Sequence, residues 1–250
     1  MVMEKKLLLI TGGSRGIGAA TARLAARQGY DVAINYLGNE KAAAEVVADV
    51  EKSNARAIAI QGDMANEADI RRMFEEVDKF GKLTHLVNNA GIVGDSGRVA
   101  DADPAMMRRV IDVNVTGAIL VAREAVRRIS IKHGGKGGAI VNLGSMASTL
   151  GAPGEYVWYA ASKGAIDALT IGLSREVAAE GIRVNAVAPG LIDTDIHASG
   201  GQPDRVERLR SMIPAGREGK AEEVAETILY LLSEQASYVV GTTVRVSGGR

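Results

Sequence analysis

The chain has 250 residues, enough for one large α/β domain or two small ones. Thirty basic residues balance thirty acidic ones, which disfavours a nucleic-acid binder and an anionic membrane surface as partner. There are no cysteines, so disulfides, thiolate catalysis and cysteine metal sites are excluded. No apolar run reaches the ~18 residues of a membrane helix, and the apolar run near the start is too short for a secretory signal. We therefore expect a cytoplasmic protein.

Short apolar runs alternate with longer helical patterns along the chain. In chain order, strands are predicted at residues 6–11, 31–36, 55–61, 84–91, 137–145, 182–190 and 242–249. Helices are predicted at 17–29, 40–53, 66–81 and 104–132, over a stretch that ends near 180, and at 220–233. This alternation predicts an α/β fold with a seven-stranded parallel sheet and helices on both faces. No linker or repeat divides the chain, so a single domain over residues 1–250 is expected.

The stretch "TGGSRGIG" (residues 11–18) follows the first predicted strand and begins the first predicted helix. A glycine turn in that position lets the backbone approach a pyrophosphate, and the helix N-terminus supplies N–H groups. Gly12, Gly16 and Gly18 are the candidate residues. The spacing is G-x3-G-x-G, so a tight turn without a ligand is the alternative.

The end of the second predicted strand carries Asn35 and Tyr36 instead of an acidic residue. An acidic residue there would bind the ribose 2′-hydroxyl of NAD. Arg15, inside the glycine turn, can pair with a 2′-phosphate because a guanidinium matches phosphate geometry. The pattern favours NADP(H) over NAD. The alternative for Arg15 is a solvated surface side chain.

Tyr159 and Lys163 lie four positions apart in "WYAASKGA", a helical pattern, and therefore share one face. A free phenol has a pKa near 10, and a nearby positive charge lowers it. The pair is suited to give a proton to the oxygen of a carbonyl that accepts a hydride. Ser145, at the end of a predicted strand, can donate a hydrogen bond to the same oxygen; Ser148 is the competing hydroxyl. Alone, a Tyr-x3-Lys pair is more typical of an amphipathic surface.

Other polar residues give weaker signals. The three histidines (His85, His133 and His197) show no ligand spacing, so no catalytic metal is predicted. Tyr156 and Trp158 can line a pocket or pack in the core. Residues 205–210 ("RVERLR") are interpreted as a solvated helix face, with contact to an anionic substrate as the less favoured alternative.

Six motifs occur in an order typical of one family: "TGGSRGIG" (11–18), "NNAG" (88–91), Asn114 in "DVNVTG", Ser145 in "VNLGS", Tyr159 with Lys163, and "PG" (189–190) followed by Thr194. From Leu7 to Gly249 the chain resembles the short-chain dehydrogenase/reductase family. The resemblance implies a Rossmann-type, doubly wound sheet, a nicotinamide cofactor and usually a homotetramer. Similar sequences include 3-oxoacyl-thioester reductases of fatty-acid synthesis and glucose-type sugar dehydrogenases.

The resemblance also implies roles for single residues. Tyr159 would be the catalytic acid/base, Lys163 would hold the nicotinamide ribose and lower the tyrosine pKa, Ser145 would orient the substrate carbonyl, and Asn114 would hold a water in a proton relay. The residues implied in cofactor binding are Gly12, Ser14, Arg15, Gly16, Ile17, Gly18, Asn35, Tyr36, Asp63, Met64, Asn88, Ala90, Gly91, Tyr159, Lys163, Pro189, Gly190, Ile192 and Thr194. Tyr159 follows Ser145 by one position more than in common members; the extra residue falls in "GAPGEYVWY" and bears on the substrate pocket.

The leading hypothesis is an NADP(H)-dependent oxidoreductase that interconverts a carbonyl and a secondary alcohol, with 3-oxoacyl thioesters as one candidate substrate class. The alternatives are a sugar or small-alcohol dehydrogenase, a nucleotide-binding sensor or scaffold without turnover, and a purely structural oligomer. Residues 191–217 are long, polar and marked by Gly200, Gly201 and Pro203. A loop of this length in a compact domain is usually functional, so the segment is expected to form a lid over the substrate.

Overall fold

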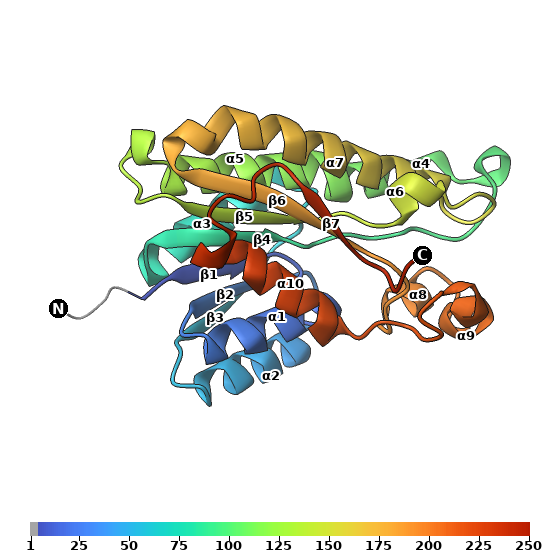
Figure 1. Ribbon diagram of the computed structural model, residues 1–250, viewed down its shortest axis with the longest axis horizontal. Coiled ribbons are helices and arrows are strands. Elements are labelled where there is room, and N and C mark those ends of the chain that lie inside the picture. Colours follow the sequence, from blue (N-terminus) through green and yellow to red (C-terminus); the bar gives the residue numbers. More distant parts are fainter. Residues whose placement is uncertain (1–4) are drawn as a thin grey trace.

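The computed structural model describes residues 5–250, with the side chain of His197 outside the described part (Figure 1). Seven strands form one parallel sheet, as predicted. They are β1 (Leu7–Ile10), β2 (Asp31–Tyr36), β3 (Ala57–Gln61), β4 (Leu83–Asn88), β5 (Gly138–Leu143), β6 (Ile182–Pro189) and β7 (Thr243–Val246), in the order β3-β2-β1-β4-β5-β6-β7. The pattern confirms the predicted doubly wound Rossmann-type fold.

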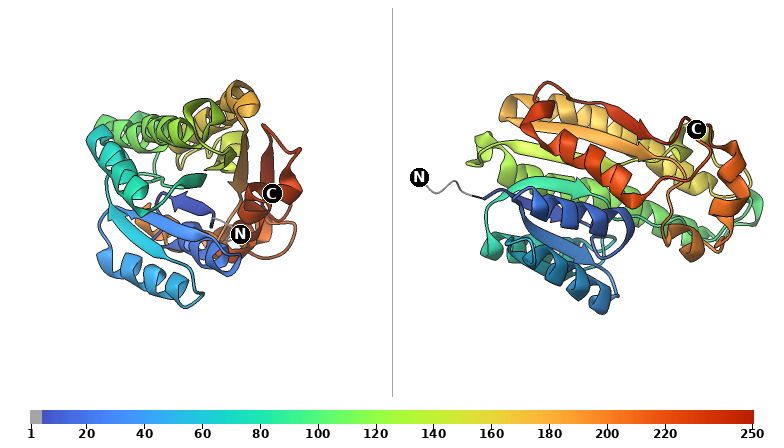
Figure 2. Two further views of the ribbon diagram at one scale, coloured as in Figure 1. Left: turned by 90° about the vertical axis from the view of Figure 1, so that its left-hand side faces the viewer. Right: turned by 60° about the horizontal axis from the view of Figure 1, so that its bottom comes forward.

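Helices cover both faces of the sheet (Figures 1 and 2). On one face lie α1 (Gly16–Arg27), α2 (Glu40–Glu51) and α10 (Ala221–Leu232), and on the other α3 (Glu67–Phe80), α5 (Ala118–Ile129) and α7 (Val157–Val177). The shorter helices are α4 (Pro104–Ile111), α6 (Ala147–Leu150), α8 (Ile196–Ser199) and α9 (Arg205–Leu209). Among the residues that the structure describes, no helix combines the length and apolarity needed to cross a membrane.

Strand β1 explains why the central strands read as unbroken apolar runs. All four of its residues are buried, with Leu8 and Ile10 in the core against α1, α2 and α10, and Leu7 and Leu9 in the core against α3 and α5. A strand covered on both faces needs apolar side chains at every position. Burial on both faces therefore accounts for the pattern that predicted the sheet.

The predicted helix at 104–132 is divided in the structure. Between α4 and α5 the backbone forms a π-helical turn, Asp112–Gly117, and a short 3-10 turn follows α5 at Ile131–His133. Gly117 packs so tightly that a Cβ atom there would lie 2.0 Å from the carbonyl oxygen of Met64. π-Helical turns within α-helices occur frequently at functional sites, and this one holds Asn114.

The strand order reverses direction at β1, which pairs with β2 on one side and with β4 on the other. In open parallel sheets, ligands bind outside the carboxyl ends of the strands at such a point. Here the glycine turn after β1 meets the loop after β4, because the Asn89 side chain donates to the carbonyl oxygens of Thr11 and Gly12 at 2.8 and 2.9 Å.

Candidate active site

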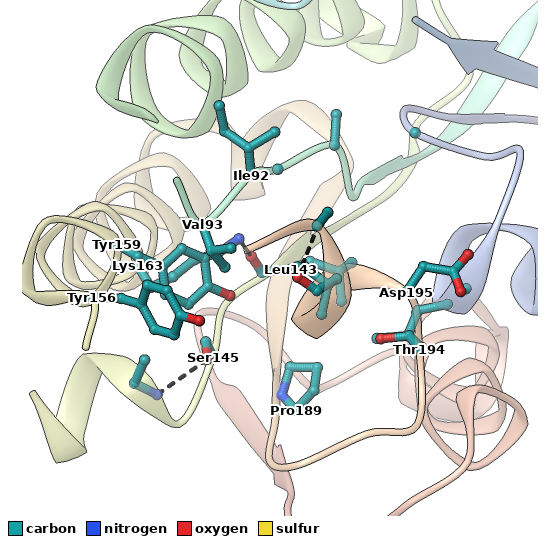
Figure 3. A pocket seen from close by; sticks show the side chains of 18 of the residues that line it. Ile92, Val93, Leu143, Ser145, Tyr156, Tyr159, Lys163, Pro189, Thr194 and Asp195 are labelled. Atoms are coloured by element: carbon teal, nitrogen blue, oxygen red, sulfur yellow. Dashed lines mark hydrogen bonds between the residues drawn. The ribbon is translucent and has the colours of Figure 1, made fainter. Parts of the chain in front are cut away.

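A cavity of about 1010 Å³ opens at this carboxyl edge of the sheet. Its lining includes most of the predicted site residues: Gly12, Ser14, Arg15, Gly16, Ile17, Asn35, Tyr36, Asp63, Met64, Ala90, Gly91, Ser145, Tyr159, Lys163, Pro189, Gly190, Ile192 and Thr194. Three predicted residues, Gly18, Asn88 and Asn114, lie behind the lining. Figure 3 shows Ser145, Tyr159 and Lys163 together, with Thr194 and Asp195 elsewhere around the cavity.

The glycine turn forms one end of the cavity. Gly12 and Gly16 adopt positive φ angles of 62° and 52°, which a residue with a side chain rarely adopts. Gly18 has a different role: a Cβ atom there would lie 2.4 Å from the Gly12 carbonyl oxygen, so Gly18 lets α1 pack against the turn from behind.

Helix α1 begins in this turn, and its first residues, Gly16 and Ile17, line the cavity. Arg15 occupies the N-cap position without a capping hydrogen bond from its side chain, and the first turn holds no acidic residue. The first N–H groups of a helix have no partner within the helix, and its dipole favours an anion there. This end of the cavity suits a phosphate group.

Asn35 lines the cavity at the end of β2, but its side-chain amide is bonded within the protein. Its side chain is buried; Oδ1 accepts from the Gly12 amide at 3.2 Å, and Nδ2 donates to the Gly62 carbonyl at 2.9 Å and to the Ile60 carbonyl at 3.3 Å. The amide group therefore holds the glycine turn against the end of β3. Tyr36, the next residue, is only partly buried and lines the cavity.

Asn88, in contrast, does not belong to the cavity lining. It is buried, and its Nδ2 donates to the Ala118 carbonyl at 2.9 Å, which joins β4 to α5. Its neighbour Asn89 lines the cavity instead. Successive side chains in a strand point to opposite faces, so alternation along "VNNAG" was the signal that could have identified Asn89.

Asp63 lines the cavity as predicted, and it has a partner that the sequence did not reveal. Arg109 of α4 forms an ion pair with it at 2.9 Å, from a position 46 residues further along the chain. Although partial burial raises the pKa of Asp63, hydrogen bonds from Arg109 and the Ala65 backbone hold it below its usual range. No sequence spacing predicts this pair.

Tyr159 and Lys163 lie one turn apart on α7, as predicted. Lys163 is buried, its Nζ donates to the Leu143 carbonyl at 2.6 Å, and it lies 5.6 Å from the centre of the Tyr159 ring. Burial lowers the pKa of Lys163 to about 8, and the charge of Asp167 opposes this shift.

Ser145, which follows β5 by two positions, lies near Tyr159 on the cavity wall (Figure 3). Burial raises the pKa of Tyr159, while the neighbouring Ser145 hydroxyl and the charge of Arg205 oppose this effect. The lowering expected from Lys163 stays a prediction; its ammonium group is hydrogen-bonded to the Leu143 carbonyl and lies beside the Tyr159 ring.

Asn114 joins the π-helical turn to two other parts of the site. Its Oδ1 accepts from the Ile92 amide at 2.9 Å, and its Nδ2 donates to the Ile92 carbonyl at 2.8 Å and to the Ser162 hydroxyl at 3.0 Å. Ser162 donates in turn to the Tyr159 carbonyl at 2.7 Å. Asn114 therefore fixes the position of α7 relative to the loop after β4.

Tyr156 and Trp158, for which the sequence left two alternatives open, both pack in one small core cluster, and Tyr156 also lines the cavity. The Tyr156 hydroxyl donates to the Gly200 carbonyl at 3.2 Å. Trp158 packs with Val93 in this cluster and donates to the Val93 carbonyl at 2.8 Å.

Residues 191–217 form short helices around the cavity, and Arg205 connects them to the loop before α7. Its guanidinium pairs with Glu155 at 2.8 Å and lies 5.6 Å from the Tyr156 ring centre. The two charged side chains are only 17% and 21% exposed. The solvated face predicted for 205–210 therefore does not include Arg205. Glu155 lies in the stretch that contains the extra residue.

Neither His85 nor His133 belongs to the described lining of the cavity. His85 is buried edge-on to Tyr30, with ring centres 5.2 Å apart, and burial lowers its pKa to about 3. Within the described part of the chain, no group of three or more histidine, aspartate or glutamate side chains could hold a metal ion. The absence of a catalytic metal stays a prediction.

A parallel sheet with a serine, tyrosine and lysine at its carboxyl edge defines a class of oxidoreductases, and comparison with known proteins agrees. The family described as enoyl-(acyl carrier protein) reductase matches residues 12–250. The chain is 53% identical to the uncharacterized oxidoreductase YgfF of Escherichia coli, over 98% of this chain and 99% of that protein. This chain belongs to the short-chain dehydrogenase/reductase family, and it is an oxidoreductase.

Two solved structures share the whole fold. A short chain dehydrogenase from Burkholderia cenocepacia, in complex with NADP, has a TM-score of 0.89 and 37% identity, over 98% of this chain and 97% of its own. A 3-ketoacyl-(acyl-carrier-protein) reductase from Brucella melitensis, complexed with NADH, has a TM-score of 0.91 and 32% identity, over 99% of both chains.

Proposed function

We propose that the protein transfers a hydride between NADP(H) and a carbonyl or secondary-alcohol substrate. The observation that carries this proposal is the placement of the Ser145 and Tyr159 hydroxyls on one cavity wall, with the Lys163 ammonium beside the ring. Three groups needed for proton transfer to a carbonyl oxygen are therefore present together, which disfavours a sensor or scaffold without turnover.

The cavity lining supports a dinucleotide as cofactor. The glycine turn and the uncapped start of α1 would hold the pyrophosphate. Arg15 is exposed and lines the cavity, and the β2 end lacks an acidic side chain, which favours a 2′-phosphate and hence NADP(H) over NAD. One solved relative is a complex with NADP and another is a complex with NADH, so the preference between the two cofactors should be measured directly.

In the reaction, three catalytic residues and one positioning residue have separate roles. Tyr159 donates its proton to the substrate oxygen, and Ser145 donates a hydrogen bond to the same atom. Lys163 contributes a positive charge at neutral pH, and Asn114 acts as a positioning residue through Ile92 and Ser162. When bound, the reduced nicotinamide supplies the hydride. Because burial raises the pKa of Tyr159, the phenol keeps its proton at pH 7, the form that reduction of a carbonyl needs.

A 3-oxoacyl thioester is the first substrate class to assay. The matched family and the Brucella melitensis relative are both described as reductases of acyl groups on a carrier protein. Residues 191–217 would act as a lid over this substrate, since nine of the cavity-lining residues come from this segment: Leu191, Ile192, Thr194, Asp195, Ile196, Ser199, Arg205, Leu209 and Met212.

The cellular setting rests on the family resemblance. We propose a cytoplasmic homotetramer built from one domain per chain. Light scattering of the purified protein tests the assembly: a mass four times that of the chain supports it, and a monomer or dimer contradicts it.

The direct test of function compares Tyr159→Phe with Ser148→Ala in the oxidation of NADPH by an acetoacetyl thioester. Loss of a general acid costs ~10²–10⁴-fold in rate. We expect this loss in Tyr159→Phe, with NADPH binding retained. Ser148 donates to the Ser145 carbonyl and should tolerate replacement with a few-fold change. A Tyr159→Phe enzyme as fast as the wild type would refute the assignment, and faster turnover with NADH would refute the cofactor preference.

A further inference from the structure

We infer that the body of the carbonyl substrate is apolar and uncharged, an alkyl or aryl group that covers Leu150 and Met212. This inference rests on the proposed function and narrows it to one substrate class. It is carried by the side chains at the end of the cavity beside Tyr159.

Most polar groups at that end are already bonded within the protein. The Tyr156 hydroxyl donates to the Gly200 carbonyl, the Ser199 hydroxyl donates to the Ile196 carbonyl at 2.9 Å, and Arg205 is paired with Glu155. A sugar would need several such groups as partners, because a buried hydroxyl without a hydrogen bond is unfavourable. This end of the cavity provides few partners beyond Ser145 and Tyr159, which bind the reacting oxygen.

The ionic groups of the lining also form no cluster of unpaired cations for an anionic substrate. Arg205 is paired with Glu155, and Lys163 donates to the Leu143 carbonyl beside the Tyr159 ring. Arg250 and the exposed carboxylate of Asp95 both line the cavity. The exposed Asp95 carboxylate stays hydrated and does not need the substrate as a partner.

Apolar side chains at the same end are exposed and have no protein cover. Leu150 of α6 is 47% exposed and Met212 is 59% exposed, and both line the cavity. Met146 and Val93 extend the apolar wall inward. Exposed apolar side chains that line a concave site are typical of ligand contact. Methionine adapts its shape to different apolar groups, so the site suits chains of several lengths.

The test is the dependence of kcat/KM on chain length, with 3-oxoacyl thioesters of N-acetylcysteamine from four to eight carbons. This thiol carries no phosphate, so the acyl chain is the one variable. Burying a methylene contributes up to about fourfold in binding. We expect kcat/KM to rise by about two- to fourfold per added carbon in the wild type, and glucose to be oxidised at least a hundredfold less efficiently than the eight-carbon alcohol.

Two variants connect the trend to the named residues. Leu150→Ser and Met212→Ser should each flatten the chain-length dependence, with the larger loss for the eight-carbon substrate. Ile131→Ser is the matched control, because Ile131 is similarly exposed at 55% but lies outside the described cavity lining; it should keep the full trend.

The possible outcomes separate the inference from the function on which it rests. A flat chain-length profile in the wild type, a trend unchanged in both variants, or faster turnover of glucose than of any apolar substrate overturns the apolar assignment and leaves the oxidoreductase intact. If no carbonyl or alcohol exchanges hydride with bound NADP(H), the proposed function fails, and the inference fails with it.

Discussion

Replacing Asn35 by aspartate separates two interpretations of the end of β2. If Asn35 faced the cofactor ribose, Asn35→Asp would supply the missing acid and shift preference towards NADH. In the structure the side chain is buried and its Nδ2 donates to the carbonyls of Ile60 and Gly62. The new carboxylate would instead face two carbonyl oxygens without a proton to share.

The size of the defect follows from those contacts. Two lost hydrogen bonds cost ~0.5–1.5 kcal/mol each, and buried acceptors without donors add ~1–3 kcal/mol. A free energy of unfolding lower by ~2–6 kcal/mol corresponds to a fall in Tm of roughly 6–18 °C in a protein of this size, at ~3 °C per kcal/mol. Because the surrounding carbonyls would raise the pKa of the new carboxyl in the folded state above its unfolded value, stability is lost as pH rises. We therefore expect a larger defect at pH 8 than at pH 5.

The assay pairs thermal unfolding at the two pH values with the ratio of kcat/KM for NADPH to that for NADH. Tyr36→Asp is the matched variant, since Tyr36 ends the same strand and lines the cavity. It should shift the ratio towards NADH with little change in Tm. An Asn35→Asp protein with wild-type Tm and a strong NADH preference would show that Asn35 faces the cofactor after all.

Three further perturbations address other contacts. The half-buried pair of Glu155 and Arg205 should give a coupling energy of about 1–2 kcal/mol in a double-mutant cycle that places glutamine at each position. The cycle is measured by denaturant unfolding, and a coupling energy near zero contradicts the ion pair. Burial lowers the pKa of Lys163 to about 8, below its unfolded value near 10.4. The free energy of unfolding of the wild type relative to Lys163→Met should therefore rise between about pH 8 and pH 10.4. A difference between the two proteins that stays constant over this range would rule out the shifted pKa. Gly18→Ala should lower Tm strongly, because its Cβ would lie 2.4 Å from a carbonyl oxygen, whereas Gly38→Ala, with open space around it, should leave Tm nearly unchanged in the same melting experiment.

The fold could be predicted because a strand that is buried on both faces carries apolar side chains at consecutive positions in the sequence. β1 is apolar throughout, and the helices between strands carry the longer pattern that a covering layer requires. The glycine turn was predictable for a similar reason, since positive φ angles at Gly12 and Gly16 demand that residue type.

The direction of individual polar side chains could not be predicted in the same way. Asn35 and Asn88 have the expected positions in the chain, yet both point into the protein and bond to its backbone. Their targets, Gly62 and Ala118, lie 27 and 30 residues away, and local spacing carries no information on such contacts. The pairing of Arg109 with Asp63 was missed for the same reason.

The cavity combines two regions that differ in how well they tolerate amino-acid substitutions. The cofactor end is built from strand ends, a helix start and buried asparagines that also hold the sheet together. The other end includes side chains such as Leu150 and Met212, which are too exposed to support the core. A library of variants restricted to these exposed positions would therefore sample new substrate preferences while keeping the framework stable, which makes the chain a practical starting scaffold for directed evolution.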